Sequence, residues 1–312
     1  MKFEDVENAR IAYKTKLSWF IAIIVGAFAI VVIIAAIAAI FSNGSILWVA
    51  SLGASMPIFF IMIMVAIFLL IFATKKENTI YKKAYKAYFV ERVLAQTFTD
   101  LQYSHELGID KGVLNATQMI NTGDRYHSND LTTGKYKNVA FTQADVHIET
   151  ESTDSDGNTT YTTIFRGRFM IFEFPKKFNF RLEVVSKFFG AKRVPEKDPQ
   201  TGRKFEKFEV ESPDFNKKFK IYAEDGFEAF YLLDPAFIDS IEKLGNTYQK
   251  KMVLGFIDNK LYVGLNDGKD SFEPPQPFKA IDEKEELAKV AESVKVVTDF
   301  VDELSLDRKI FS

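Results

Sequence analysis

The 312-residue chain contains no cysteine. This absence excludes disulfide bonds, thiolate metal sites and a cysteine nucleophile. It also fits a domain that stays out of oxidising compartments. An excess of charge of either sign is lacking too, because 40 basic residues stand against 42 acidic ones. This balance argues against a nucleic-acid-binding protein.

The motifs of common catalytic sites are also missing. The sequence contains no GxSxG elbow, Walker A loop, GxGxxG fingerprint or HExxH pair. His105 and His127 lie apart from other candidate ligands. The sequence therefore predicts no cofactor and favours a protein that is not an enzyme.

Two long runs near the start of the chain lack charge altogether, Leu17–Phe41 and Ile46–Ala73. Each exceeds the roughly 20 residues with which a helix crosses about 30 Å of hydrocarbon. A helix can cross because it closes its own backbone hydrogen bonds. We therefore expect a transmembrane hairpin over residues 17–73, with spans at about 18–41 and 46–73.

Lysines flank the hairpin on one side of the membrane. Lys14 and Lys16 precede the first span, Lys75 and Lys76 follow the second, and residues 42–45 between the spans carry no charge. The positive-inside rule places both termini in the cytoplasm, so we expect a multi-pass protein of the inner (plasma) membrane. The alternative is a signal peptide cleaved near residues 36–38, against which stand the length of the apolar run and its acidic leader.

The remainder divides into three expected parts. Residues 1–16 form a cytoplasmic N-terminal segment, residues 75–108 a juxtamembrane helix, and residues 109–312 a cytoplasmic α+β domain. Apolar residues recur at near-helical spacing from Thr79 to about Leu107, and Gly108 is a plausible stop.

The domain itself is expected to hold a mainly antiparallel sheet flanked by helices. Short runs rich in β-branched and aromatic residues alternate with turns, and such close spacing favours antiparallel pairing. The expected strands are 136–141, 146–150, 161–165, 168–174, 180–185, 205–210, 218–223, 250–256 and 261–265, and the expected helices are 226–233 and 235–244.

A final amphipathic helix is expected over Glu283–Leu304. Its apolar residues fall at alternating spacings of three and four, which forms a heptad seam. The seam is made by Leu287, Val290, Val294, Val297, Val301 and Leu304. Such a seam either docks on the sheet or pairs with a second copy of the chain.

One stretch of alternating polar residues is a candidate metal site. Asp145, His147 and Glu149, followed by Glu151, share one face of an expected strand. They could bind a divalent metal, or form a polar face with Val146 and Ile148 turned to the core. A second stretch, Asp154–Asn158, resembles the start of a calcium loop, but its Asp-Gly pair is typical of a hairpin turn.

Basic residues suggest contact with lipid headgroups or with an acidic partner. The juxtamembrane helix carries three candidates and the turns of the sheet carry six more: Lys82, Lys83, Lys86, Lys176, Lys177, Lys192, Arg193, Arg203 and Lys204. Each cation near an anionic leaflet contributes about 1 kcal/mol of attraction. Ordinary solvated charge is the alternative interpretation.

Several motifs resemble those of a bacterial membrane-anchored family known as domain of unknown function 3137. They are Gly134–Tyr136, Ala144–Val146, Phe165–Phe169, Glu211–Phe215, Glu228–Pro235 and Phe272–Glu273. The resemblance covers most of residues 80–305, and a hairpin ahead of the domain is typical of the family. It implies no established activity and no catalytic residues.

The sequence thus leaves three functional hypotheses. The first is a membrane-anchored cytoplasmic binding or regulatory module that engages a protein partner or anionic lipids. The second is a membrane-bound hydrolase that uses the carboxylate and histidine face. The third is a channel or transporter subunit built from hairpins that assemble into a homo-oligomer, against which speaks the lack of ionisable residues in the spans.

Overall fold

The computed structural model divides the chain into two compact units. Unit 1 comprises residues 1–88 and 274–285, and unit 2 comprises residues 89–273 and 286–312. The structure describes residues 1–41, 46–175, 177–178, 180–192, 197, 202–249 and 251–307, without the side chains of residues 34–35, 38–41 and 46–59.

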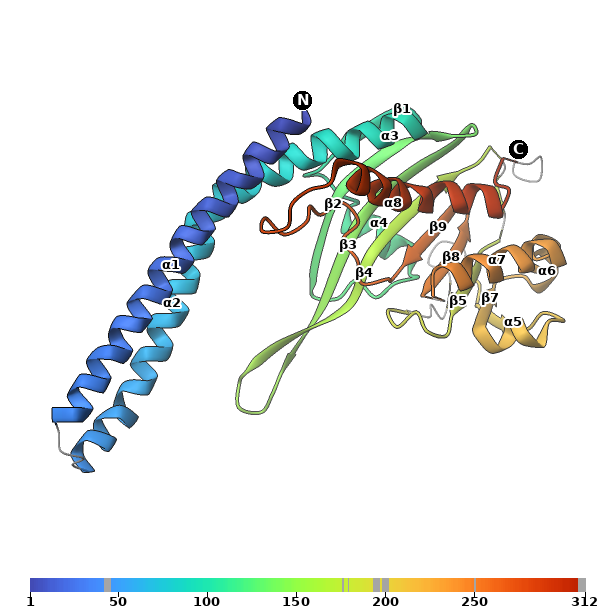
Figure 1. Cartoon of the computed structure of the whole chain (residues 1–312). Helices are drawn as coiled ribbons and strands as arrows, with labels where there is room; N and C mark the ends of the chain where they lie inside the picture. Colours follow the sequence, from blue (N-terminus) through green and yellow to red (C-terminus); the bar gives the residue numbers. More distant parts are fainter. Residues whose placement is uncertain are drawn as a thin grey trace. The chain divides into compact units, whose positions relative to one another are not determined.

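Unit 1 is built on two long helices, α1 (Phe3–Phe41) and α2 (Ile46–Tyr85) (Figure 1). They run antiparallel, since residues near the start of α1 meet residues near the end of α2. Lys16 Nζ lies 2.7 Å from Glu77 Oε1, and the rings of Tyr13 and Tyr81 lie 6.3 Å apart. The expected N-terminal segment 1–16 is therefore not a separate element but the first part of α1.

A distant segment, residues 274–285, completes unit 1. The buried guanidinium of Arg10 donates to the carbonyl of Pro277, and the Tyr81 hydroxyl donates to the carbonyl of Pro275 at 3.1 Å. Tyr88 donates in the same way to the carboxylate of Glu283. These hydrogen bonds hold residues 275–283 against the start of α1 and the end of α2.

The apolar part of α1 buries none of its described side chains inside the chain. Among the described side chains, one helix, over Phe3–Ile33, is long and apolar enough to cross a membrane, and none of its most apolar stretch is buried in the chain. Along α2, Phe60, Phe68 and Phe72 are each at least two-thirds exposed. The second expected span lies largely among the side chains outside the description, so it stays a prediction.

The juxtamembrane helix ends earlier than the sequence suggested. After α2 the chain passes through a π-helical turn, η1 (Lys86–Val90), into α3 (Glu91–Thr97). Residues Thr99–Ser104 then form strand β1, which pairs with β2. The prediction of a helix to Leu107 was wrong. The apolar residues of Thr99–Ser104 continue the helical spacing, but the pairing of this segment with β2 stabilises a strand instead.

Unit 2 contains a nine-stranded sheet with the order β1-β2-β3-β4-β9-β8-β5-β7-β6, and the pairings between its described strands are antiparallel. Its strands after β1 are β2 (Arg125–Tyr136), β3 (Val139–Thr153), β4 (Thr159–Glu173), β5 (Leu182–Ser186), β6 (Glu206–Phe208), β7 (Phe219–Ala223), β8 (Met252–Ile257) and β9 (Lys260–Leu265). The fold is thus α+β, as expected.

One expected strand, 136–141, contains a turn, while its last three residues open β3. Lys137 and Asn138, in the middle of the strand expected over 136–141, both have positive φ and join β2 to β3. Two successive residues in that region make the tight turn that suits the twist of a hairpin. The whole of β2 before Tyr136 was missed, because its polar composition hides the alternation of a strand.

Four helices of unit 2, α4 to α7, begin with side-chain caps. They are α4 (Lys111–Thr117), α5 (Pro213–Lys218), α6 (Gly226–Leu232) and α7 (Pro235–Thr247), followed by α8 (Glu283–Glu303). Ser212 caps α5 and Asp234 caps α7, each directly before a proline. Proline suits the first helical position because its missing N–H would have no partner there. Pro213 and Pro235 therefore start helices.

Two apolar layers cover the sheet, one on each face. On the face that we call the α4 face, Val146 and Ile148 pack in a buried cluster with Leu114, Met119 and Ile120. The opposite face, which we call the α8 face, is crossed by α8 (Figure 1). There the ring of Phe172 stacks on that of Phe300, with centroids 6.5 Å apart. The prediction that Val146 and Ile148 turn to the core is confirmed.

The seam of α8 docks within the chain. Val290, Val294, Val297 and Val301 are almost fully buried, while Leu287 is half-buried. The ring of Phe300 also stacks on Tyr248, which follows α7, at 5.7 Å. Of the two outcomes expected for the seam, docking on the sheet is the one observed.

A close approach between two strands requires glycine at position 167. Gly167 lies inside β4 with φ of +153°, and a Cβ there would fall 2.0 Å from the carbonyl oxygen of Leu265. The neighbouring strand β9 approaches so closely that no side chain fits.

A buried ion pair on β5 gives a pH-dependent prediction. Arg181 Nη2 lies 3.0 Å from Glu183 Oε1, and burial, only partly offset by Arg181, raises the pKa of Glu183 to about 7. Because the folded pKa exceeds the unfolded one, Glu183 contributes stability below pH 4.5 that is lost as the pH rises through 7. We expect the unfolding free energy of Glu183→Gln, relative to wild type, to rise by about 1–3 kcal/mol between pH 5 and pH 8.

The measurement is denaturant unfolding of the full chain in detergent at both pH values. Glu206→Gln, on the exposed strand β6, serves as the control and should show no such change. A Glu183→Gln difference that is the same at both pH values would show that the carboxyl of Glu183 titrates normally.

Candidate functional site

Three buried or half-buried carboxylates meet on the α8 face of the sheet. Asp130, Asp145 and Asp270 each place a carboxylate oxygen within 4.8 Å of the other two. Two carboxylates at that separation repel each other by about 3 kcal/mol at an effective dielectric of about 20. We call these three residues the carboxylate cluster. Among the described residues, it is the group of acidic or histidine side chains close enough together to hold a metal ion.

Asp130 reaches the cluster from a β-bulge. Asn129 pairs with Asp145 and Thr132 with Gln143, so that two residues of β2 oppose the single residue Ala144 of β3. Asp130 has φ of +59°, a left-handed conformation that aspartate tolerates better than most residues. A bulge of this kind redirects a side chain, and such bulges are frequent next to functional sites.

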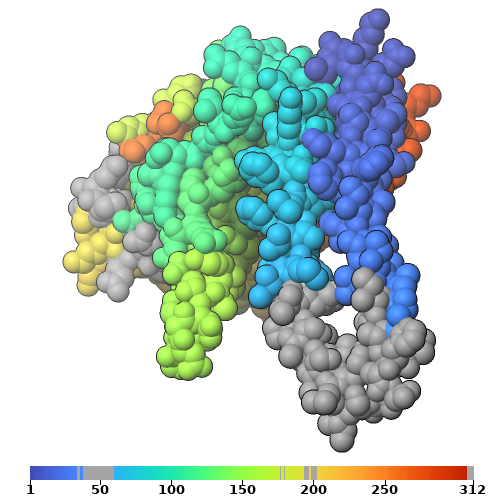
Figure 2. All heavy atoms as spheres, turned by 90° about the vertical axis from the view of Figure 1, so that its left-hand side faces the viewer, coloured from blue at the N-terminus to red at the C-terminus, as the bar shows by residue number. Residues whose placement is uncertain are grey.

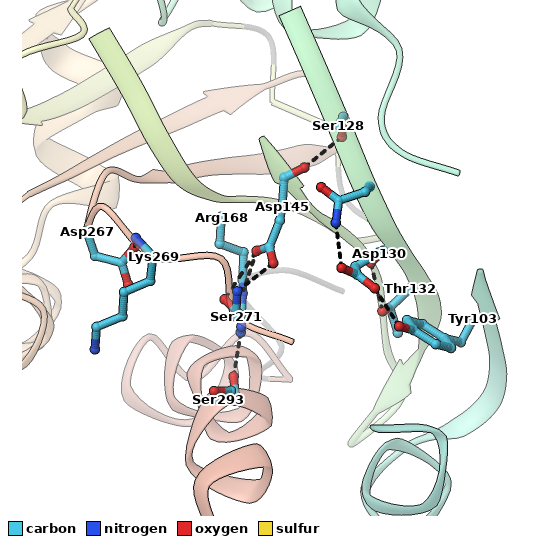
Figure 3. Close-up of polar contacts among 11 residues, drawn as sticks. Tyr103, Ser128, Asp130, Thr132, Asp145, Arg168, Asp267, Lys269, Ser271 and Ser293 are labelled. Carbon is cyan, nitrogen blue, oxygen red and sulfur yellow. Dashed lines mark hydrogen bonds and ion pairs between the residues drawn. The ribbon is translucent and has the colours of Figure 1, made fainter. Parts of the chain in front are cut away.

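One donor from β1 and one from β2 itself orient the Asp130 carboxylate. Tyr103 of β1 donates its hydroxyl to Oδ1, and Asn129 donates Nδ2 to Oδ2 at 2.6 Å (Figure 3). Burial, together with Asp130, raises the pKa of Tyr103 far above its usual value. The phenol therefore stays protonated and remains a hydrogen-bond donor.

Asp145 is held by the loop that follows β9. Ser271 donates its backbone N–H to Oδ2 at 2.7 Å and its hydroxyl to Oδ1 at 3.2 Å (Figure 3). The same loop supplies Asp270, the residue just before Ser271. The loop thus joins two members of the cluster: it contributes Asp270 itself and holds Asp145 through Ser271.

Arg168 places a buried positive charge beside Asp145. Its Nε lies 3.9 Å from Asp145 Oδ1, and its Nη1 donates to the carbonyl of Ser293 on α8. Arg168 is 3% exposed and also lies 5.5 Å from the centre of the Phe272 ring. It therefore joins the sheet to α8 and offsets part of the charge of the cluster.

Burial opposes ionisation of Asp145. It raises the pKa of Asp145 to about 7, and the neighbouring carboxylates of Asp270 and Asp130 act in the same direction. Arg168 and the backbone N–H of Ser271 act against the rise. An arrangement of this kind can either share protons or hold a cation among its oxygens.

Gln143 lies beside the cluster. It is two residues before Asp145 on the same face of β3, and it is 1% exposed. Neither of its amide atoms has a hydrogen-bond partner among the described residues. A buried amide without a partner costs about 1–3 kcal/mol, so each such group needs an explanation.

The expected metal face is brought together only in part. His147 Nε2 lies 2.9 Å from Thr163 Oγ1 and 3.9 Å from Glu149 Oε1, and both side chains are partly exposed. Asp145 is instead grouped with Asp130 and Asp270, a group that includes neither His147 nor Glu149. The alternation of residues along β3 correctly placed Asp145 on the face opposite Val146. It could not show that Asp130 and Asp270, from other segments, lie beside it.

The turn that resembles a calcium loop caps the hairpin of β3 and β4. Asp154 Oδ1 accepts from the backbone N–H of Asp156 and of Asn158, at 3.0 and 2.8 Å. These bonds lower the pKa of Asp154 and hold the tip of the projecting hairpin (Figure 2). The carboxylate serves the turn, as the Asp-Gly signal predicted.

The basic candidates occupy varied environments. Lys86 is buried, Lys83 is exposed, Lys177 lies 3.4 Å from Asp258, and Lys192 lies 3.6 Å from the centre of the Tyr222 ring. Arg203 and Lys204 are exposed, Lys82 is half-buried, and Lys176 and Arg193 fall outside the described residues. These positions leave the lipid and partner interpretations as predictions.

Sequence reasoning missed Asp130, Asp270, Arg168 and Gln143. Asp130 lies in the polar strand β2 that was not recognised, and Asp270 lies in a loop. Arg168 lies within the family motif Phe165–Phe169, but the resemblance gives it no role. One signal in the sequence could have revealed Arg168: it is a charged residue at an inward-facing position of the apolar alternation in β4.

Residues 163–306 match the model of a family described as "Protein of unknown function (DUF3137)". This confirms the family resemblance for that segment. No curated protein matches the sequence.

A solved structure that matches is the crystal structure of the mycobacterial trehalose monomycolate transport factor A, TtfA. The match has a TM-score of 0.37 and 9% sequence identity, and it covers 72% of this chain and 95% of that chain. A similarity at this level supports no argument about fold or function.

Proposed function

We propose that the chain is a membrane-anchored binding or regulatory module of the inner (plasma) membrane. In this proposal α1 and the apolar part of α2 cross the bilayer, and both termini and unit 2 are cytoplasmic. The observation that carries the proposal is the bare apolar surface of α1, none of whose most apolar stretch is buried in the chain. Water would solvate such a surface at high cost, whereas lipid tails would not.

The apolar surface of α2 supports the same anchor. Over residues 60–72, large apolar side chains point outward around the helix, among them Phe60, Phe68 and Phe72, at 67%, 68% and 72% exposure. A helix of a soluble protein would bury one side of such a surface. The lysines at 14, 16, 75 and 76 bracket both spans on one side, which favours cytoplasmic termini.

A protein is the favoured partner for unit 2. The short helix α6 leaves Phe227, Phe230 and Tyr231 at 81%, 53% and 71% exposure. Phe230 lies 5.3 Å from Phe208 of β6, and the residues on either side of Phe208, Lys207 and Glu209, pair with each other at 3.2 Å. Exposed aromatic residues without excess positive charge suit a protein contact better than an anionic lipid surface.

Site-specific photocrosslinking in membranes tests the binding role. We expect a crosslinker at Phe227 to give one discrete adduct, and a crosslinker at Thr160, in the projecting β3–β4 hairpin, to give none. Replacing Tyr231 by Ser should weaken the adduct at 227. Adducts with lipid alone, or equal adducts at both positions, would contradict a protein contact at α6.

A further inference from the structure

The carboxylate cluster calls for a positive ligand, and this inference is independent of the anchoring proposal. Three carboxylates within 4.8 Å of one another share the site with the guanidinium of Arg168. Each ionised carboxylate there disfavours the ionisation of the others. A divalent cation would replace this repulsion by attraction, as carboxylate oxygens are the preferred ligands of hard cations.

Gln143 provides a second, independent observation. The pairs Asn129–Asp145 and Thr132–Gln143 flank the bulge that carries Asp130. Asp145 and Gln143 therefore lie on either side of Asp130 and on the same face of the sheet. The buried amide of Gln143 finds no hydrogen-bond partner among the described residues, so its oxygen is available as a fourth ligand.

The hydrogen bonds around the cluster match the outer shell of a metal site. Tyr103 and Asn129 donate to Asp130, and Ser271 donates to both oxygens of Asp145. Donors of this kind fix the direction of ligand side chains. The donor set contains oxygen alone, which suits Ca²⁺, Mg²⁺ or Mn²⁺ rather than softer metals.

We propose that Asp130, Asp145 and Asp270, together with the amide oxygen of Gln143, bind one hard divalent cation on the α8 face of the sheet. The ligands come from β2, β3 and the loop after β9. The ion would therefore tie that loop to β3 and to the bulge of β2.

The test is a titration of the full chain in detergent, freed of metal by EDTA, with Ca²⁺, Mg²⁺ and Mn²⁺ in turn. We expect at least one of them to bind saturably with one ion per chain. At about 100 times its Kd that ion should raise the Tm by about 5–10 °C. No saturable binding by any of the three would overturn the proposal.

Three variants separate the cluster from adventitious surface sites. Asp270→Asn and Gln143→Leu should each weaken binding by about tenfold or more, whereas Asp154→Asn, in the exposed β3–β4 turn, should leave it unchanged. Gln143→Leu should also keep or raise the Tm in EDTA, because it removes a buried amide that has no partner. Unchanged affinity in both Asp270→Asn and Gln143→Leu would place the ion elsewhere and overturn the proposal.

Discussion

Replacing Arg168 by Met is expected to lower the free energy of unfolding by about 3–5 kcal/mol. The substitution preserves most of the buried volume but removes the positive charge beside Asp145 and the donor to the Ser293 carbonyl. Asp145 then stays buried without the guanidinium of Arg168 beside it. Denaturant unfolding of the full chain in detergent, with EDTA present, measures the loss.

Arg166→Met is the matched control. Arg166 lies two residues earlier in the same strand but is exposed, so its replacement should change stability by less than about 0.5 kcal/mol. The double variant Asp145→Asn/Arg168→Met should be more stable than Arg168→Met alone, because it removes one of the uncompensated charges. A loss below about 1 kcal/mol in Arg168→Met would mean that the cluster is already neutral without the arginine.

Replacing Phe300 by Ala is expected to cost about 3–5 kcal/mol of unfolding free energy. Phe300 is fully buried between Phe172 of the sheet and Tyr248 after α7, at ring distances of 6.5 and 5.7 Å. Its loss opens a cavity at the point where α7, α8 and the sheet meet. The same unfolding measurement applies, together with the mass of the particle in detergent.

Glu292→Ala, at an exposed position of α8, is the control and should stay within about 0.5 kcal/mol of wild type. The mass separates docking from self-association. If the seam of α8 joined two copies of the chain, Phe300→Ala would shift the particle towards half its mass. With the seam docked on the sheet, the stability falls and the mass does not change.

The elements that the sequence predicted well are those whose pattern is local. The seam from Val290 to Val301 repeats at helical spacing, and its burial follows directly from that repeat. The hairpin of β8 and β9 is equally local, because its alternating apolar residues and short turn lie within residues 252–265. The helix expected over residues 235–244 likewise begins at Pro235, where α7 starts.

The parts that failed depend on pairing between distant residues. Thr99–Ser104 has apolar positions that suit either a helix or a strand, and only its pairing with β2 decides the outcome. The carboxylate cluster is a stronger case. Asp130, Asp145 and Asp270 come from three separate segments, and a bulge and a loop that no short motif reveals bring them together.

The account as a whole depends on both α1 and α2 crossing the membrane. Its most direct test is a pair of reporters fused after Ser312, one active only in the cytoplasm and one active only outside it, with a chain lacking residues 46–73 as the topological control. We predict cytoplasmic activity for the full chain in the membrane fraction, and a reversal to the outer side when the second span is deleted. Outer-side activity of the full chain, or its recovery as a soluble protein without detergent, would contradict the account.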